Sequence, residues 1–160
     1  MGRYFLITLF ASIGFFAQAQ EVIIAEKFAD IEDLFNTKSE GVHVINFWAT
    51  WCGPCVAELP YFIEANNTFK DKDVRFSFVS LDFKKQYESK LLPFLEKTPL
   101  PGDQYNLWDM DYNAWIDKVS PEWSGAIPVT IIMGPKGKLV ATSSFESSEE
   151  LNDLILKALK

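Results

Sequence analysis

The sequence predicts a single α/β domain built on a mixed β-sheet, and three observations carry this prediction. Short runs rich in valine, isoleucine and phenylalanine alternate with longer segments whose apolar residues recur at helical spacing. The last two predicted strands are separated by a turn at residues 134–137, so they should pair antiparallel, whereas the earlier strands are joined through helices. A length of 160 residues suits one domain with an ordinary core.

The composition excludes several classes of protein. A hydrophobic content of 48% is too high for a disordered chain. A formal net charge of −7 disfavours nucleic-acid binding, because a phosphate backbone requires a basic face. Two cysteines and one histidine do not suit a self-contained zinc module, which needs four protein ligands. We therefore expect a compact acidic domain with no metal, no other cofactor and no nucleic-acid partner.

The first nineteen residues predict a secretory signal peptide. Arg3 supplies a positive charge, residues 4–16 form an uncharged apolar run, and residues 17–19 have the small-x-small pattern of a cleavage site. The run is too short for a transmembrane helix, which needs about 20 residues. We expect cleavage before Gln20, a mature domain of residues 20–160, and a periplasmic or secreted location. The alternatives are an uncleaved N-terminal anchor and a buried N-terminal helix.

Runs of β-branched and aromatic residues predict the strands. Residues 42–48 contain no Lys, Arg, Asp or Glu, as is typical of a strand buried on both faces, and residues 74–81 alternate as in a second central strand. His43, the only histidine, matches no functional pattern and is expected to be an ordinary strand residue. The predicted strands cover residues 22–25, 42–48, 74–81, 129–133 and 138–141.

Apolar residues spaced three or four apart predict the helices. Pro93 should kink or shorten the third of them, because proline lacks the N–H group that a helix interior requires. Ser147 can cap the last helix, and Glu149 and Glu150 suit its first turn. The predicted helices cover residues 27–37, 52–69, 84–97 and 147–160.

Residues 103–123 combine five aromatic with five acidic residues. The spacing of Trp108, Tyr112, Trp115 and Val119 matches one stripe of a helix, and such a stripe usually packs into a core. The remaining aromatic residues, with their acidic neighbours, are alternatively the border of a groove for a polypeptide partner.

The motif that carries chemistry is Trp-Cys-Gly-Pro-Cys at residues 51–55, between a buried strand and a helix. Two cysteines three residues apart can form and reopen a disulfide. The first lies at the positive end of the helix, which favours its thiolate. A metal site would need further ligands, and a structural disulfide across so short a loop would stabilise little. Redox activity of Cys52 and Cys55 is the favoured interpretation.

Residues 44–60, VINFWATWCGPCVAELP, resemble the active-site segment of thioredoxin-like proteins, and most of all that of the TlpA/ResA-type extracytoplasmic thiol–disulfide oxidoreductases. Residues 125–130, GAIPVT, resemble the loop that carries the cis-proline of this family. The resemblance extends over residues 22–160. It implies a thioredoxin fold, a central mixed β-sheet flanked by helices, with residues 103–123 as an insert before the cis-proline strand.

The resemblance also implies roles for individual residues. Cys52 would be the nucleophile that attacks a disulfide, and Cys55 would resolve the mixed disulfide that results. Trp51, Ile127 and Pro128 would form the edge on which a substrate lies. Trp48, beside the motif, is more simply explained as a core residue.

One position departs from cytoplasmic thioredoxin. Asn46 stands where that family commonly has a proton-accepting aspartate, and an amide cannot take up a proton at neutral pH. The TlpA/ResA type instead carries a glutamate three residues after the second cysteine, where this chain has Glu58. The i to i+3 spacing puts Glu58 on the same helix face as Cys55. We expect Glu58 to be a proton acceptor; the alternative is a solvated surface glutamate.

The sequence thus predicts a periplasmic thiol–disulfide oxidoreductase that acts on protein disulfides. The Gly-Pro pair between the cysteines matches reducing thioredoxins, so a reductant is favoured over a disulfide-forming oxidant. The expected partners are protein thiol or disulfide substrates and a membrane thiol reductant as electron donor. A peroxidase of the same fold would need a lone reactive cysteine preceded by a threonine and a proline at a different spacing, and Thr50-Trp51-Cys52 does not provide this pattern. A non-enzymatic binding module that keeps the fold is the other alternative.

Overall fold

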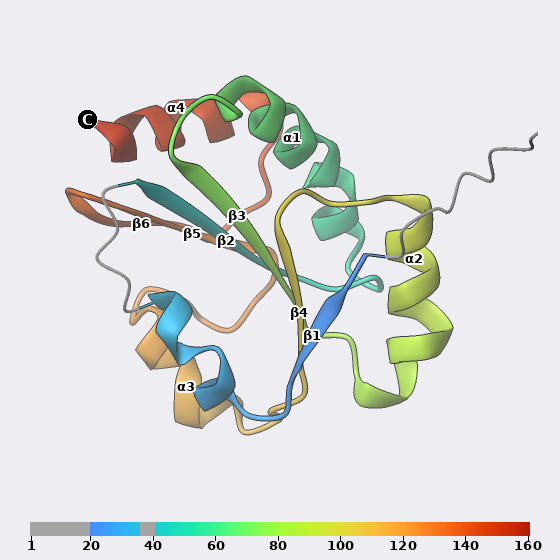
Figure 1. The fold of residues 1–160 in the computed structure, drawn as a ribbon. Coiled ribbons are helices and arrows are strands. Elements are labelled where there is room, and N and C mark those ends of the chain that lie inside the picture. The colour runs from blue at the N-terminus through green and yellow to red at the C-terminus, as the bar shows by residue number, and fades with distance from the viewer. Residues whose placement is uncertain (1–19, 36–40) are drawn as a thin grey trace, which may run out of the picture.

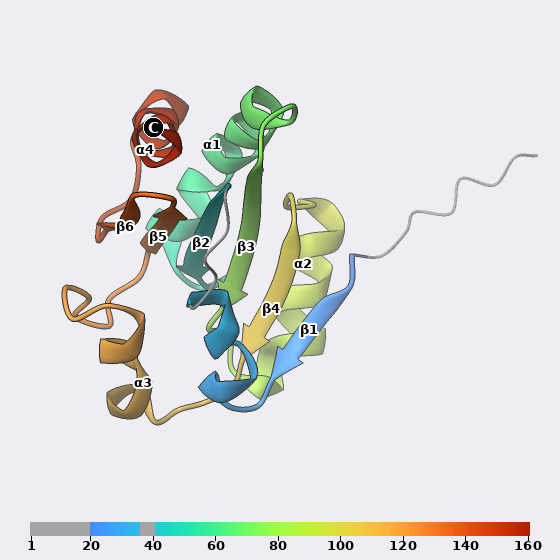
Figure 2. The ribbon, with the colours of Figure 1, turned by 60° about the vertical axis from the view of Figure 1, so that its left-hand side comes forward.

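A computed structural model describes residues 20–35 and 41–160 of the chain, so the predicted signal peptide, residues 1–19, lies outside the described part. Six strands form one sheet in the order β1-β4-β3-β2-β5-β6 (Figures 1 and 2). The first four in that order are mutually parallel, β5 is antiparallel to β2, and β6 is antiparallel to β5. The mixed sheet expected from the sequence is confirmed. The strands are β1 (Val22–Ala25), β2 (Val42–Trp48), β3 (Val74–Ser80), β4 (Asp103–Leu107), β5 (Val129–Gly134) and β6 (Gly137–Ala141).

Helices cover both faces of the sheet (Figure 2). Buried residues of α1, α4 and the segment that leads into α2 share one hydrophobic cluster with β2 and β3. Buried residues of α3 and of the short helix η1 form the second cluster on the opposite face. Within residues 20–35 and 41–160, every helix is too short or too polar to span a lipid bilayer. The helices are η1 (Phe28–Asp30), η2 (Glu32–Phe35), α1 (Gly53–Phe69), η3 (Lys84–Gln86), η4 (Tyr87–Leu91), α2 (Leu92–Lys97), α3 (Tyr112–Val119) and α4 (Ser148–Leu159).

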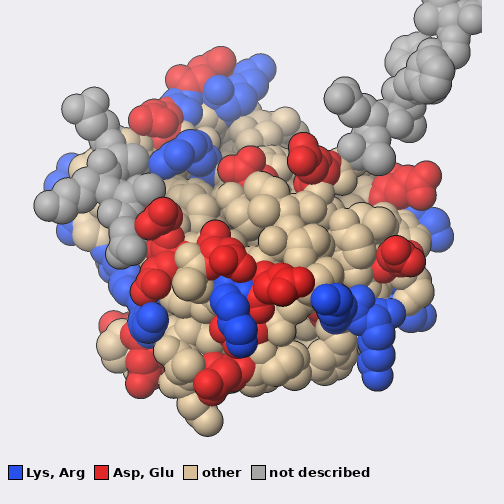
Figure 3. Space-filling model, turned by 60° about the horizontal axis from the view of Figure 1, so that its bottom comes forward, with Lys and Arg blue, Asp and Glu red and all other residues tan. Residues whose placement is uncertain are grey.

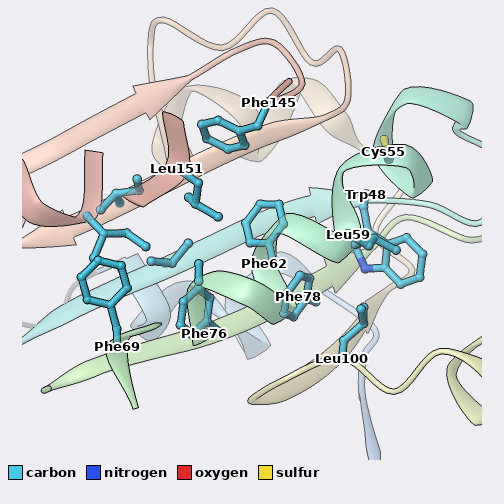
Figure 4. Packing of buried hydrophobic residues seen from close by; sticks show 14 of the residues in the cluster. Trp48, Cys55, Leu59, Phe62, Phe69, Phe76, Phe78, Leu100, Phe145 and Leu151 are labelled. Atoms are coloured by element: carbon cyan, nitrogen blue, oxygen red, sulfur yellow. The ribbon is translucent and has the colours of Figure 1, made fainter. Parts of the chain in front are cut away.

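Strand β2 is buried along its whole length, between β3 and β5. Its residues alternate between the two clusters: Val44 and Trp48 face α1, whereas Phe47 faces α3. Trp48 packs against Phe94 and is a core residue, as expected. Figure 4 shows Trp48 beside Cys55 at one end of the first cluster, so the core extends up to the cysteine motif.

The helix predicted over residues 27–37 is wrong in its described part. The chain forms two short 3-10 helices there, η1 and η2. The carboxylate of Asp109, which follows the neighbouring strand β4, accepts a hydrogen bond from the backbone N–H of Phe28 at 3.1 Å. The ring of Phe28 stacks on Trp115 with centroids 5.3 Å apart. These tertiary contacts stabilise the two 3-10 helices, so the segment does not form the predicted α-helix.

The sequence analysis missed strand β4. Residues 103–107 lack apolar alternation, because Gln104 and Asn106 are polar, yet both are buried. The Asn106 amide donates to the backbone oxygens of Ser80 at 3.1 Å and Asp82 at 2.9 Å, and such pairing makes a buried polar residue tolerable. Residues 103–123, which the sequence analysis expects to be an insert, thus contain a strand between β1 and β3 as well as helix α3.

The predicted helical stripe of the same segment begins too early. Trp108 follows β4 and donates its backbone N–H to the oxygen of Ala25 at 2.8 Å, whereas α3 begins at Tyr112. Trp115 and Val119 are buried in the core, as the stripe predicts. The helix predicted over residues 84–97 is split into η3, η4 and α2, with a proline in the first turn of α2.

Charged side chains do not gather into one patch on the face shown in Figure 3, where acidic and basic groups are interspersed with uncharged ones.

A buried ionisable group lies inside the sheet. His43 of β2 is 4% exposed, and its Nε2 lies 2.8 Å from the hydroxyl oxygen of Ser77. Burial lowers the pKa of His43 from 6.5 to about 4; Arg75 lowers it further and Asp103 opposes this.

We predict that His43 destabilises the fold in acid. Its pKa is lower in the folded chain than in the unfolded chain, so below pH 6.5 the unfolded chain binds more protons and stability falls until about pH 4. Between pH 7.5 and pH 5 the free energy of unfolding should drop by about 2 kcal/mol more than in His43→Gln. Urea titrations at both pH values measure it, and contributions of other groups cancel in the comparison. Equal drops in both proteins would contradict the prediction.

Candidate active site

The two cysteines form a disulfide at the start of α1. The sulfur atoms are 2.00 Å apart and the Cα atoms 5.3 Å apart. Cys52 is the N-cap residue, and its sulfur accepts a hydrogen bond from the backbone N–H of Cys55 at 3.3 Å. Cys52 is 7% exposed, whereas Cys55 is completely buried. The two sulfurs therefore differ in access, as the order of the motif predicts.

Three further predicted residues surround the exposed side of the disulfide. The Sγ atom of Cys52 lies 3.7 Å from the backbone oxygen of Ile127. The Ile127–Pro128 peptide bond is cis, as expected, and Pro128 is buried while Ile127 is half-buried. Trp51 is 53% exposed and stacks on Phe83 with ring centroids 6.4 Å apart. The cysteine pair thus lies between a backbone edge and an exposed aromatic surface.

Glu58 is buried and hydrogen-bonded on the same side of α1 as Cys55. It is 1% exposed, so it is not a solvated surface residue. One carboxylate oxygen accepts the amide N–H of Asn46 at 3.0 Å, and the other accepts the backbone N–H of Phe145 at 2.8 Å. The Asn46 amide donates also to the hydroxyl of Thr130 at 3.0 Å. The cluster joins β2, α1, β5 and the loop before α4 (Figure 4 labels Phe145 and Cys55).

The environment of Glu58 favours its neutral form. Burial raises the pKa of Glu58 from 4.5 to about 7, because a charged carboxylate loses its hydration inside the protein. The hydrogen bonds from the Phe145 backbone and the Asn46 side chain act in the opposite direction. A carboxyl group with a pKa near neutrality can either take up or release a proton under ordinary conditions.

A second buried carboxylate was missed by sequence reasoning. Asp82 is completely buried and accepts the backbone N–H of Thr50 at 2.9 Å, the Thr50 hydroxyl at 2.5 Å and the Ser80 hydroxyl at 2.8 Å. These bonds fix the loop immediately before the cysteine motif. An aspartate after a strand is normally read as a loop residue, so the sequence offered no signal for this role. The partners of Glu58 on β5 and before α4 were equally invisible.

The arrangement suits two-electron thiol chemistry. Cys52 keeps a small exposed fraction, Cys55 is completely buried, and an ionisable carboxyl with a pKa of about 7 lies on the same helix face. Within residues 20–35 and 41–160, no group of three or more His, Cys, Asp or Glu side chains is placed to hold a metal ion.

Comparison with known proteins places this site in a family. A model described as the AhpC/TSA family matches residues 25–142. Thiol-disulfide oxidoreductase ResA of Oceanobacillus iheyensis is 32% identical over 107 residues, which cover 66% of this chain and 50% of that protein. ResA of Bacillus cereus is 30% identical over 122 residues, which cover 66% of this chain and 70% of that protein. The chain thus spans only half the length of the first relative.

The fold comparison agrees. The crystal structure of a thioredoxin-related protein from Neisseria meningitidis serogroup B superposes with a TM-score of 0.60 at 23% identity, over 77% of this chain and 88% of that one. The chain belongs to the AhpC/TSA family, and its fold is the thioredoxin-like fold that the sequence predicts. Within that family its sequence is similar to the thiol-disulfide oxidoreductases named ResA, and Cys52 and Cys55 form its disulfide.

We predict that the carboxyl group of Glu58 titrates near neutrality. Its folded pKa lies above its unfolded value, so the stability that the neutral carboxyl contributes is present below pH 4.5 and is lost as the pH rises through 7. Carbon NMR of side-chain carboxyls in the oxidised protein should show one midpoint near pH 7, which Glu58→Gln removes. A Glu58 signal with its midpoint near 4.5 would contradict the prediction.

Proposed function

We propose that this protein reduces disulfide bonds in polypeptide substrates outside the cytoplasm, with Cys52 as the nucleophile. The difference in burial between the two cysteines carries the proposal. Cys52 reaches the surface and is flanked by the Ile127 oxygen, whereas Cys55 is completely buried. A protein substrate can therefore approach only the sulfur of Cys52.

The reduced enzyme starts the reaction as a dithiol. The Cys52 thiolate attacks one sulfur of the substrate disulfide, forming a mixed disulfide and releasing the other substrate sulfur as a thiolate that takes a proton from water. Cys52 is the N-cap of a 17-residue helix, where unpaired backbone N–H groups and the helix dipole stabilise negative charge. The favourable position of Cys52 makes it the better thiolate of the pair.

Cys55 completes the cycle. It attacks the Cys52 sulfur of the mixed disulfide, so that the Cys52–Cys55 disulfide forms and the second substrate sulfur leaves. Cys55 must lose its proton for this step, and its surroundings are apolar. We propose that the ionised carboxylate of Glu58 accepts this proton and later passes it to water or to the departing thiolate. The raised pKa of Glu58 supports this assignment, as does its place on the same helix face.

The edge beside the disulfide is the proposed substrate-binding surface. The backbone oxygen of Ile127 lies 3.7 Å from the nucleophilic sulfur, and the next residue, Pro128, is buried. An extended substrate segment can place its own backbone along this edge, while the exposed ring of Trp51 covers apolar substrate atoms. These are the roles expected for Trp51, Ile127 and Pro128 from the sequence.

The direction of electron flow is the reducing one in this proposal. The Gly53-Pro54 pair between the cysteines supports it by resemblance to reducing thioredoxins. A reductant in an oxidising compartment needs an electron source, and we propose a membrane thiol reductant that regenerates the dithiol. The predicted signal peptide of residues 1–19 supports export. The side-chain amide of Gln20, where the mature domain would begin, bonds both backbone groups of Leu100.

We predict that the two cysteines differ in function. Cys52→Ser should abolish insulin reduction, because the remaining thiol is buried. Cys55→Ser should accumulate a stable mixed disulfide through Cys52, because nothing is left to resolve it. Mass spectrometry of the trapped adducts, with insulin as substrate, identifies the linked sulfur. Adducts through Cys55 in the Cys52→Ser protein would show that the roles are reversed. Wild-type protein without insulin reductase activity would contradict the proposed function.

We predict that Glu58→Gln slows the resolving step. The variant keeps the shape and can keep the bond from Phe145, but it cannot accept the Cys55 proton. Release of the mixed disulfide should slow by about a hundredfold, in the range of general-base effects. Quenched-flow measurement with a preformed mixed disulfide tests this. Glu64→Gln, an exposed glutamate on the same helix, is the matched control and should release at the wild-type rate. Equal rates for both variants would rule out Glu58 as the base.

A further inference from the structure

A groove of about 390 Å³ lies between the end of β3 and the loop after β4, on the side of the active site where Trp51 contacts Phe83. Its lining is chiefly apolar, with two lysines of η3 and a buried aspartate. The residues that line it are Leu81, Asp82, Phe83, Lys84, Lys85, Leu107, Trp108 and Met110. None of them belongs to the cysteine motif or to the proline loop, so the groove is not used by the mechanism above.

The groove continues from the surface beside the disulfide. Phe83 forms one of its walls and stacks on Trp51, which precedes the nucleophilic cysteine. The structure describes four large hydrophobic residues that are clearly exposed, and three of them lie along this path: Trp51 at 53%, Phe83 at 39% and Met110 at 55%. A strip of exposed apolar side chains that starts at the reactive sulfur is a surface for binding a substrate.

Hydrogen bonds hold the groove and the active-site loop in a fixed relation. Asp82, below the groove, binds the Thr50 backbone N–H and hydroxyl. Asn106 of β4 donates to the backbone oxygen of Asp82 at 2.9 Å, and the Trp108 ring N–H donates to Asn106 at 2.6 Å. The wall of the groove is therefore connected, through two buried side chains, to the loop that carries the nucleophile. A preformed groove costs less ordering free energy when a ligand binds.

The rim of the groove carries two lysines, although the chain has a net charge of −7, and the first of them is paired with an acidic side chain. The ammonium group of Lys84 lies 4.4 Å from the centre of the Trp108 ring and 3.6 Å from the carboxylate of Glu26. Lys85, next in the chain, is exposed. A substrate with an acidic side chain next to a large apolar one would complement this groove. Its acidic group can face Lys85, and its apolar group can contact the apolar lining.

We propose that this groove is the specificity subsite for an extended polypeptide substrate, in which it binds a large apolar side chain while Lys85 faces an acidic neighbour. The groove begins beyond the ring of Phe83, so the bound side chain lies about three residues from the substrate cysteine, at about 3.3 Å per extended residue. The inference rests on the proposed function, because it assigns the substrate class of the same active site.

The test uses disulfide-linked dimers of a single-cysteine peptide with Phe, Leu or Ser placed three residues from the cysteine, on either side. Rate constants are measured with reduced full-length protein by quenched flow and chromatography. We expect the wild type to reduce the Phe or Leu peptide about tenfold faster than the Ser peptide, as burial of one large apolar side chain allows. In Met110→Ser this ratio should fall to about threefold or less. Ile23→Ser changes a comparably exposed hydrophobic residue outside the groove and should keep the wild-type ratio.

The charge on the rim is tested with the same peptides. At low salt, the wild type should reduce a peptide with Lys next to the apolar residue several-fold more slowly than the same peptide with Glu there. In Lys85→Glu the Lys peptide should instead be reduced faster than the Glu peptide. Equal rates for the Phe and Ser peptides in the wild type would overturn the inference, as would an equal loss of the ratio in Ile23→Ser. A dimer in sedimentation that Met110→Ser dissociates would also overturn it, because a second copy would then occupy the groove.

Failure of the proposed function gives a different result. A small aromatic disulfide such as dithionitrobenzoate reaches the Cys52 sulfur without entering the groove. If reduced wild-type protein reduces neither this compound nor any peptide, the oxidoreductase proposal itself fails. If it reduces the compound and all peptides alike, only the specificity subsite is wrong.

Discussion

The buried hydrogen-bond cluster around Glu58 is the interaction on which the arrangement of the site depends. A carboxyl group that is 1% exposed is costly unless each oxygen has a partner, and here the two partners come from two other parts of the chain. Asn46 fixes α1 against the centre of β2, and Phe145 fixes the loop before α4. Because these contacts lie inside the core, the helix that carries both cysteines has one position relative to the sheet.

The same cluster connects packing to chemistry. Strand β2 is buried on both faces and ends beside the cysteine motif, so the fully buried sulfur of Cys55 lies in the core and only Cys52 reaches the surface. A buried thiol is difficult to deprotonate, because its thiolate would lack hydration. The structure places an ionisable carboxyl, raised in pKa by the same burial, on the same helix face. Burial thus creates both the need for a base and a base with a suitable pKa.

The sequence predicts the parts of the molecule that local patterns determine. The strands β2, β3, β5 and β6, the helices α1 and α4, the cysteine pair and the spacing of Glu58 follow from periodicity or from the motif. Strand β4 could not be predicted, because the polar residues Gln104 and Asn106 are buried and leave no apolar alternation. Gln104 bonds the nearby backbone oxygen of Gly102, whereas Asn106 bonds the distant backbone oxygen of Asp82. The helix expected at residues 27–37 is replaced by 3-10 turns through contacts with Asp109, which lies some eighty residues further along the chain. Asp82 and the groove above it likewise exist only in three dimensions.

The reduction potential of the Cys52–Cys55 pair as a function of pH, in the wild type and in Glu58→Gln, tests the central claim most directly. If the Glu58 carboxyl is coupled to the cysteines, its affinity for a proton differs between the oxidised and reduced states, and that difference enters the pH slope of the potential. We expect the two curves to diverge between pH 6 and pH 8, around the raised pKa of Glu58, and to run parallel outside that range. Parallel curves from pH 5 to pH 9 would contradict the coupling of the buried carboxyl to the redox pair.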